Sequence, residues 1–283
     1  MNKLRELFSK DELYVAPGVY NGLSAKLVEQ ASFPIVYASG GAIARSIGVP
    51  DMGLISFTQI VDILTQIVDV VSIPVIADFD NGYGNAVNAM YAIKAFERSG
   101  VAAVHMEDQQ LPKRCGHLSG KHIVSTNEFV QKIKAVKDTA SNDFYLIART
   151  DAIAVEGFDK AIERGHKYME AGADMLFIEA PTTVEQIERI GKELPYPKLL
   201  NMFYSGKTPI VPLEKLKSWG YNLVIDPSDL QRASIYAMQE TLKEVKRCGH
   251  SEGIKDRLVS FKEREHIIGT EKYMDVSEKY KDK

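Results

Sequence analysis

The chain alternates short apolar runs with longer stretches of helical periodicity, and this alternation limits its fold more than any other feature. Runs typical of strands cover residues 13–15, 34–38, 74–78, 102–106, 144–148, 174–178, 198–201 and 222–225. Apolar side chains spaced three and four apart predict helices over residues 22–31, 57–71, 85–98, 127–140, 158–171, 184–194, 212–219 and 228–247. Strands as uniformly apolar as 74–77 and 175–178 are typical of a parallel sheet that is covered on both faces.

Eight strand–helix units predict an α/β fold of one closed (β/α)₈ TIM barrel, for which 283 residues are sufficient. An open sheet with a dinucleotide-binding turn is disfavoured, because the chain has no Gly-x-Gly-x-x-Gly motif. We therefore expect a single barrel domain over residues 1–283, with a C-terminal helical extension over about 251–283. The apolar residues of this extension have no barrel core to pack against, which predicts contact with another subunit.

Charge and hydropathy exclude several classes of partner. Lys and Arg number 35 against 38 Asp and Glu, so no basic surplus favours nucleic-acid binding. The richest apolar stretch, 54–74, is interrupted by Asp62, Gln66 and Asp69, so no membrane span is expected. The charged N-terminal residues lack the apolar core of a signal peptide, and a cytoplasmic location is expected.

Polar and acidic residues follow the predicted strands, at the end where barrel enzymes carry their chemistry. They are Ser39-Gly40-Gly41, Asp78 and Asp80, Glu107 and Asp108, Arg149 and Asp151, Glu179, Asn201, and Asp226. Carboxylate oxygens suit a hard divalent cation, so Asp78 and Asp80 are predicted metal ligands with Glu107 in support. The alternative is that some of these acids cap helices, and Asp226, followed by Pro227 and Ser228, is typical of a cap.

The two longest predicted loops, 39–56 and 107–126, are candidate active-site loops. The second has basic residues and no acidic one from position 111 onward, which predicts an anionic substrate. Cys115 lies among these cations, so we expect a lowered thiol pKa and a role as nucleophile or acid. Gly116 and Gly120 would let the loop close as a lid. The alternative is an exposed basic loop with an incidental cysteine. The basic residues are Lys113, Arg114, His117, Lys121 and His122.

The pentapeptide Lys-Arg-Cys-Gly-His occurs at 113–117 and again at 246–250. The second copy ends a predicted helix, with Gly249 as a left-handed cap. A zinc site formed by Cys115, His117, Cys248 and His250 is the alternative, but Cys-x-His spacing is unusual for structural zinc.

In order along the chain, these motifs resemble the isocitrate lyase and phosphoenolpyruvate mutase superfamily over about residues 15–280. The motifs are Tyr37-Ala38-Ser39-Gly40-Gly41, Asp78-Phe79-Asp80-Asn81-Gly82-Tyr83-Gly84-Asn85, Glu107-Asp108-Gln109, Lys113-Arg114-Cys115-Gly116-His117, Ala148-Arg149-Thr150-Asp151 and Ile178-Glu179-Ala180. The Cys-containing loop is the signature of the lyases, whereas the phosphonate mutases have an Asn-containing loop without that Cys. The resemblance implies a homotetramer with an exchanged terminal helix, and dependence on Mg²⁺ or Mn²⁺.

The resemblance also implies retro-aldol cleavage of a small 2-hydroxy di- or tricarboxylate, of the methylisocitrate or dimethylmalate type, into a 2-keto acid and a carboxylate. Cys115 would be the general acid, His117 and Lys113 would set its protonation and bind the leaving carboxylate, and Glu107 would support the metal. Substrate contacts are implied for Tyr37, Ser39, Gly40, Gly41, Gly116, Arg149, Glu179, Asn201 and Arg232. The alternatives are a phosphoenolpyruvate mutase, phosphonopyruvate hydrolase or oxaloacetate hydrolase on the same barrel, and a non-catalytic structural barrel.

The chain departs from methylisocitrate lyases after the seventh strand, where those enzymes usually read Asn-x-Thr-Glu-Phe-Gly. Here residues 201–209 read Asn-Met-Phe-Tyr-Ser-Gly-Lys-Thr-Pro. Phe203 and Tyr204 would make the pocket more apolar, which favours alkyl-substituted dicarboxylates over tricarboxylates.

Overall fold

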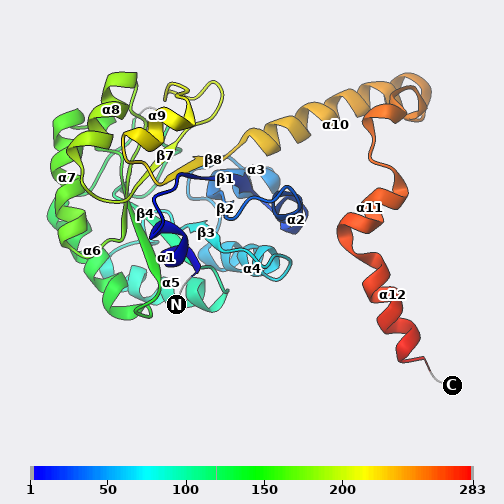
Figure 1. Cartoon of the computed structure of the whole chain (residues 1–283), viewed down its shortest axis with the longest axis horizontal. Coiled ribbons are helices and arrows are strands. Elements are labelled where there is room, and N and C mark those ends of the chain that lie inside the picture. The colour runs from blue at the N-terminus through cyan, green and yellow to red at the C-terminus, as the bar shows by residue number, and fades with distance from the viewer. Residues whose placement is uncertain (1–2, 119, 282–283) are drawn as a thin grey trace. The chain divides into compact units, whose positions relative to one another are not determined.

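The computed structural model describes residues 3–118 and 120–281. In this part of the chain, parallel strands close into a barrel in which each strand pairs with the next and β8 pairs with β1 (Figure 1). The predicted (β/α)₈ barrel is therefore confirmed. Each predicted strand is present with its ends shifted by at most two residues, except β1, which ends four residues beyond its predicted end. The strands are β1 (Tyr14–Val19), β2 (Val36–Ala38), β3 (Val75–Asp78), β4 (Ala103–Glu107), β5 (Tyr145–Thr150), β6 (Met175–Ile178), β7 (Lys198–Asn201) and β8 (Leu223–Asp226).

Helices follow the strands in turn, as predicted. They are α2 (Gly22–Gln30), α4 (Phe57–Val68), α5 (Ala86–Arg98), α6 (Thr126–Thr139), α7 (Phe158–Glu170), α8 (Val184–Glu193), α9 (Leu213–Ser218) and α10 (Asp229–Cys248). Several begin at a side-chain cap; Ser56 accepts from the Gln59 amide, and the Gln59 side chain bonds back to the Ser56 amide. Two short helices were not predicted, α1 (Lys3–Phe8) and α3 (Gly40–Ser46), because neither is long enough to show a clear apolar period.

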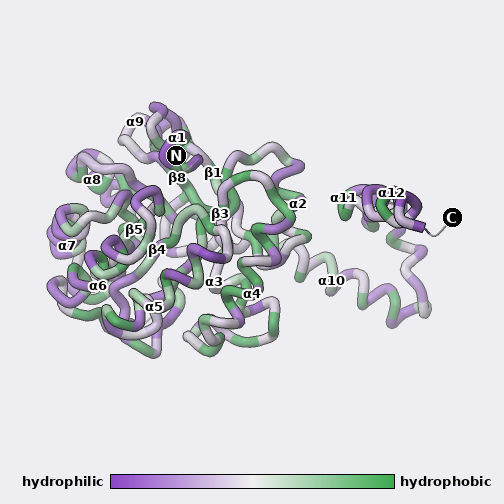
Figure 2. Tube along the Cα trace, turned by 90° about the horizontal axis from the view of Figure 1, so that it is seen from below, coloured by the Kyte–Doolittle hydropathy of each residue, from purple (hydrophilic) through white to green (hydrophobic). Residues whose placement is uncertain are grey.

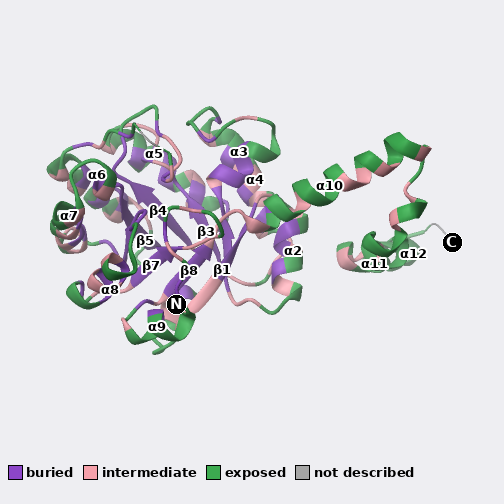
Figure 3. Ribbon diagram, turned by 90° about the horizontal axis from the view of Figure 1, so that it is seen from above, coloured by how far each residue is buried: buried purple, intermediate pink, exposed green. Residues whose placement is uncertain are grey.

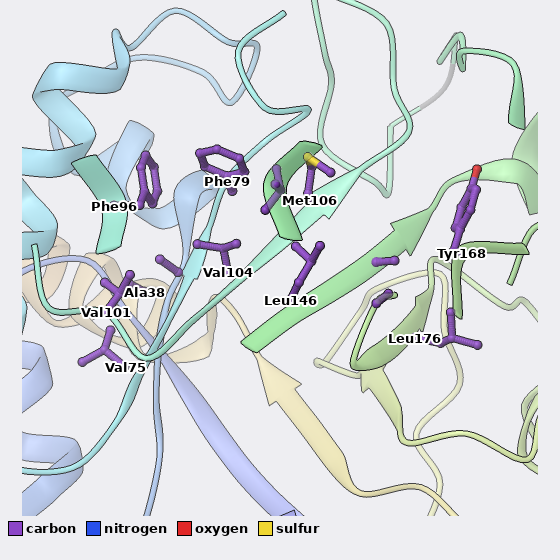
Figure 4. Close-up of a cluster of buried hydrophobic side chains, with 14 of the residues drawn as sticks. Ala38, Val75, Phe79, Phe96, Val101, Val104, Met106, Leu146, Tyr168 and Leu176 are labelled. Atoms are coloured by element: carbon purple, nitrogen blue, oxygen red, sulfur yellow. The ribbon is translucent and has the colours of Figure 1, made fainter. Parts of the chain in front are cut away.

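The outer face of the barrel packs against the helices. Alternate strand residues such as Val75, Leu146 and Leu176 belong to this layer, as does Phe96 of α5 (Figure 4). Phe96 lies 4.7 Å from the ring centroid of Phe79 in an edge-to-face contact. Burial of this layer on both sides explains why the strands are apolar at nearly every position (Figure 3).

The inner face of the barrel positions the site. Ile76, Ile147 and Phe177 pack together inside it, on three different strands. Because successive strand residues alternate between the two faces, the residue two positions further on points to the same interior. At the carboxyl ends of the strands, the residues that point inward for this reason are polar. They are Asp78, two positions after Ile76, and likewise Arg149 after Ile147, Glu179 after Phe177, Glu107 after His105, and Asn201 after Leu199.

The chain divides into two compact units, the first ending at Asp229 and the second beginning at Leu230. The second unit contains most of α10, a 3₁₀ helix η2 (Glu252–Arg257), α11 (Phe261–Ile268) and α12 (Thr270–Lys279). It therefore starts before the residue, about 251, at which the extension was predicted. Gly249 has φ 81° directly after α10, so the predicted left-handed cap is confirmed.

Apolar residues are interspersed with hydrophilic ones along α11 and α12 (Figure 2), and neither helix has a buried residue. In the described residues, every helix is too short or too polar to cross a membrane. A second 3₁₀ helix, η1 (Ala152–Ala154), lies in the first unit.

Candidate active site

Asp78 and Asp80, the predicted metal ligands, lie together at the end of β3. The Asp80 amide donates to Asp78 Oδ1 at 3.0 Å, and Asp80 has a left-handed backbone, with φ 48°. Such a conformation costs free energy in a residue other than glycine and is typical of functional sites. Gly40 lies against this pair, since a Cβ there would be 2.6 Å from Asp78 Oδ2. The glycine therefore allows the start of α3 to approach the carboxylate.

Lys113 joins the two candidate active-site loops. Its Nζ lies 2.5 Å from Asp51 Oδ1 in the first loop and 2.6 Å from Asp80 Oδ1. Burial raises the pKa of Asp80 to about 6, although the positive charge of Lys113 acts in the opposite direction. Gly40, Asp78 and these three residues line a cavity of about 20 Å³, which has room for about one water molecule.

Arg149 is shared by three carboxylates. Its Nε and Nη2 bind Asp151 at 3.0 and 3.2 Å, its Nη1 lies 3.1 Å from Glu107 Oε2, and its Nε lies 3.6 Å from Glu179 Oε2. Burial opposes the charge of Arg149, but the carboxylates raise its pKa well above the ordinary value. Burial likewise raises the pKa of Glu107 well above its ordinary value. Arg149 is thus a permanent cation in the centre of the acidic residues.

The donor set fits a hard divalent cation. Glu107 Oε1 is buried without a hydrogen-bond partner among the described residues. Buried carboxylates in excess of cations either keep a proton, which the raised pKa of Glu107 favours, or are balanced by further positive charge. No three His, Cys, Asp or Glu side chains of residues 3–118 and 120–281 form a metal-binding group, but Mg²⁺ typically uses one or two carboxylates and keeps several waters. The carboxylates of this network are the buried Asp51, Asp78, Glu107, Asp151 and Glu179 and the half-buried Asp80, against the buried cations Lys113, Lys121 and Arg149.

The Cys115 loop is docked on this network. A Cβ on Gly116 would lie 2.5 Å from Arg149 Nη2 and 2.6 Å from Glu179 Cδ, so the main chain passes directly over both side chains. His117 Nε2 lies 3.1 Å from Glu179 Oε1, and buried Lys121 binds Asp151 at 2.7 Å. Position 116 therefore has room only for glycine, because any side chain would collide with Arg149 and Glu179. Gly120, with φ 76°, is the glycine of this loop that needs a left-handed backbone. Ser119 of the predicted loop lies outside the described residues.

The predicted lowering of the Cys115 pKa is wrong. Burial raises the pKa of this thiol, and the hydrogen bond from the His117 amide only partly offsets that effect. Lys113 forms ion pairs with Asp51 and Asp80, and Lys121 forms one with Asp151. These cations are therefore neutralised by carboxylates and do not lower the pKa of the thiol. A thiol that keeps its proton is suited to act as an acid rather than as a nucleophile.

The other predicted contact residues lie around this centre. The Tyr37 hydroxyl bonds to His105 Nε2 at 2.7 Å, and the same nitrogen lies 3.5 Å from Asp78 Oδ1. Asn201 Nδ2 donates to Glu179 Oε1 at 3.4 Å.

Near α3, the Ser39 side chain accepts from the Ala42 amide and caps the helix. A Cβ on Gly41 would lie 2.9 Å from Asp51 Oδ2, so this glycine also allows a close approach. Arg232 lies on α10 in the second unit, and its role in binding substrate stays a prediction. Asp226 accepts from the Ser228 and Asp229 amides, which supports its reading as a helix cap.

Sequence reasoning missed Asp51 and His105. Asp51 lies in an irregular loop with no periodicity to indicate where it points. His105 lies two positions before Glu107 on β4 and therefore points to the same side of the strand, so the alternation of strand side chains could have predicted its place in the site. After β7, Phe203 packs against His117 with ring centroids 4.6 Å apart. Tyr204 is 72% exposed, which does not support its predicted part in an apolar pocket.

Comparison with known proteins agrees with this geometry. The family model described as phosphoenolpyruvate phosphomutase matches residues 4–246. A 2,3-dimethylmalate lyase from Eubacterium barkeri is 42% identical, over 98% of this chain and 97% of that protein. A 2-methylisocitrate lyase from Aeropyrum pernix is also 42% identical, over 95% of this chain and 87% of that protein. Among solved structures, a phosphonopyruvate hydrolase in complex with oxalate and Mg²⁺ superposes with a TM-score of 0.89 at 33% identity, covering 98% of this chain and 97% of that one.

Proposed function

Because the chain belongs to the phosphoenolpyruvate phosphomutase family and is a carbon–carbon lyase of that superfamily, we propose that it cleaves a 2-hydroxy di- or tricarboxylate into a 2-keto acid and a carboxylate. The substrate would be of the 2,3-dimethylmalate or 2-methylisocitrate type. The observation that carries the proposal is the docking of the Cys115 loop against Arg149 and Glu179, in a position where burial raises the pKa of the thiol.

The reaction makes two demands on the side chains. The C2 hydroxyl first gives its proton to an ionised carboxylate of the site. When the bond between C2 and C3 then breaks, the C2 oxygen becomes that of a ketone, and the electron pair left on C3 spreads into its carboxylate. Lys113 and Arg149 supply positive charge for the substrate's carboxylates. Cys115 then donates its proton to C3 as general acid, a role that typically accelerates a reaction by about 10²–10⁴-fold. Closure of the loop keeps bulk water away from the carbanion.

Asp78 and Asp80 would hold Mg²⁺ or Mn²⁺, with Glu107 in support. Such a cation lowers the pKa of the 2-hydroxyl and stabilises the alkoxide. The excess of buried carboxylates supports this assignment, because an anionic substrate cannot approach them without added positive charge.

Phe203 contacts His117 beside the catalytic loop, and an aromatic ring at this edge of the site favours an alkyl-substituted dicarboxylate over a tricarboxylate.

We further propose that the second unit packs against other copies of this chain in a homotetramer. Exposed apolar side chains on α10, α11 and α12 need a partner surface; Leu242 is 66% exposed and Phe261 is 73% exposed. Sedimentation of the intact protein should show a tetramer, and Leu242→Glu should lower its mass. A monomeric mass for the unmodified chain would contradict this assignment.

The function is tested by product release from four candidate substrates, with Mg²⁺ and with EDTA. A 2-keto acid is measured from 2,3-dimethylmalate and 2-methylisocitrate, oxalate from oxaloacetate, and inorganic phosphate or phosphoenolpyruvate from phosphonopyruvate. We expect metal-dependent release from a hydroxy acid that is lost in Cys115→Ser. Turnover of phosphonopyruvate alone would favour the mutase or hydrolase alternative, and turnover of oxaloacetate alone would favour the oxaloacetate hydrolase.

A further inference from the structure

The segment after β7 contacts the catalytic loop without having a part in the chemistry described above. It contains Phe203, Gly206 and Lys207. The Lys207 backbone N–H donates to His117 Nδ1 at 2.9 Å, and the Phe203 ring meets the imidazole edge-to-face with the planes at 70°. Gly206 lies beside both rings, since a Cβ there would be 3.0 Å from Phe203 Cζ and 3.2 Å from His117 Cε1. Two independent contacts thus hold the imidazole from the β7 side.

The hydrogen bond from Lys207 determines the tautomer of His117. A backbone amide can only donate, so Nδ1 must be the acceptor and carries no proton. In the neutral ring the proton then lies on Nε2, which faces Glu179 Oε1 at 3.1 Å. Asn201 Nδ2 lies 3.3 Å from the same nitrogen, and its N–H groups donate to Glu179, so they leave Nε2–H to this carboxylate. Burial opposes ionisation of Glu179, but Arg149 and His117 hold its pKa at about 2, so it is an ionised acceptor. The opposite tautomer would turn a lone pair toward this carboxylate.

The orientation of His117 matters for the thiol, because His117 is two residues from Cys115 and its contact with Glu179 fixes the loop over the site. Gly116, between them, already lies against Arg149 and Glu179. A ring that can adopt either tautomer would loosen this contact and let the thiol move relative to the substrate. Displacements of about 1 Å cost on the order of 100-fold in rate.

We propose that the Lys207 backbone amide and the Phe203 ring are positioning elements for the Cys115 loop, and that they hold His117 as the Nε2–H tautomer that binds Glu179. The link to catalysis rests on the proposed function, in which Cys115 is the acid. The tautomer does not depend on it.

The test uses the full chain labelled with ¹⁵N-histidine. The six histidines give few signals, and those of His117 are assigned from their loss in His117→Gln. Spectra are recorded near pH 8.5, about two units above the ordinary histidine pKa, where neutral rings dominate. Lys207→Pro removes the backbone N–H. Lys207→Ala changes only the side chain and is the matched control.

We expect the Nε2–H signature in the unmodified protein and in Lys207→Ala, and a mixture of tautomers in Lys207→Pro. With a substrate that the enzyme cleaves, Lys207→Pro should lower kcat by about 10–100-fold and leave KM within about threefold, because the defect lies in placing the acid. A pure Nε2–H signature in Lys207→Pro, or its loss in Lys207→Ala, would overturn the proposal.

If Lys207→Pro fails to fold, Gly206→Ala provides the second test, because its Cβ pushes against Phe203 and His117. We expect a change in the His117 signals of this variant, and an unchanged spectrum together with unchanged kcat would also overturn the proposal. If the unmodified chain cleaves no hydroxy acid, the proposed function fails, whereas the tautomer result still decides the role of Lys207.

Discussion

Gly116→Ala tests whether the docked loop is the catalytic state. A Cβ at this position would lie 2.5 Å from Arg149 Nη2 and 2.6 Å from Glu179 Cδ, whereas ordinary contacts begin at 3.4 Å. Both side chains are buried and held by several partners, so the loop must retreat by about 1 Å. Because such a displacement of a catalytic group costs on the order of 100-fold in rate, kcat should fall by about that factor. The loop can shift toward solvent, so the free energy of unfolding should change by less than about 1 kcal/mol.

The assay is the steady-state rate of product release, with thermal unfolding measured on the same samples. Gly165→Ala on α7 is the matched control, because its Cβ would lie 3.3 Å from Leu176 Cδ1 and 3.5 Å from Ile178 Cδ1, both flexible methyl groups. This control should keep kcat and, through better helix propensity, gain up to about 1 kcal/mol. If Gly116→Ala retained kcat within threefold of the unmodified enzyme, the docked position of the loop would not be the one in which the reaction occurs.

Three further predictions concern the general acid Cys115, the divalent cation, and Lys198 at the start of β7. Cys115→Ser should lower kcat by about 10²–10⁴-fold, because a hydroxyl is a much weaker acid than a thiol, and should leave the thermal midpoint of unfolding unchanged. Steady-state kinetics and melting curves measure the two quantities, and retained activity would show that Cys115 is not the general acid. Mg²⁺ at 100 times its Kd should raise the free energy of unfolding by about 2.7 kcal/mol, and Asp80→Asn should abolish this stabilisation. Melting curves with Mg²⁺ and with EDTA measure it in both proteins, and an equal gain in the variant would show that the cation binds elsewhere. Burial lowers the pKa of Lys198 from 10.5 to about 8. Between pH 8 and 10.5 the unfolded chain therefore binds a proton that the folded chain lacks, and the free energy of unfolding rises over this range by about 2–3 kcal/mol. Urea titrations from pH 7.5 to 10.5 should show that Lys198→Met reduces this rise, and equal slopes in both proteins would contradict the assignment.

The barrel could be predicted because its signals are local. Apolar runs, helical periods and capping residues each involve neighbours in the sequence, and these elements occur close to their predicted positions. The position of a residue at the end of a strand is also a local signal, so Asp78, Glu107, Arg149 and Glu179 were correctly expected to gather at one end of the barrel. The short α3 and the position of Asp51 escaped prediction because neither has a repeating pattern.

The partners of the charged groups could not be predicted. Lys113 pairs with Asp51, 62 positions away, and the Lys207 amide binds His117 across 90 positions. The sequence places a cysteine among cations and therefore indicates a lowered pKa, yet those cations lie on carboxylates and burial raises the pKa instead.

By itself, the sequence determined the barrel, the end of it that carries the chemistry and the residue types gathered there, because these follow from chain order and the alternation of strand side chains. Only the tertiary structure decided which charges neutralise one another, which glycines are required by space and which tautomer His117 adopts. Those properties depend on burial and on distances of a few ångströms between residues that are far apart along the chain.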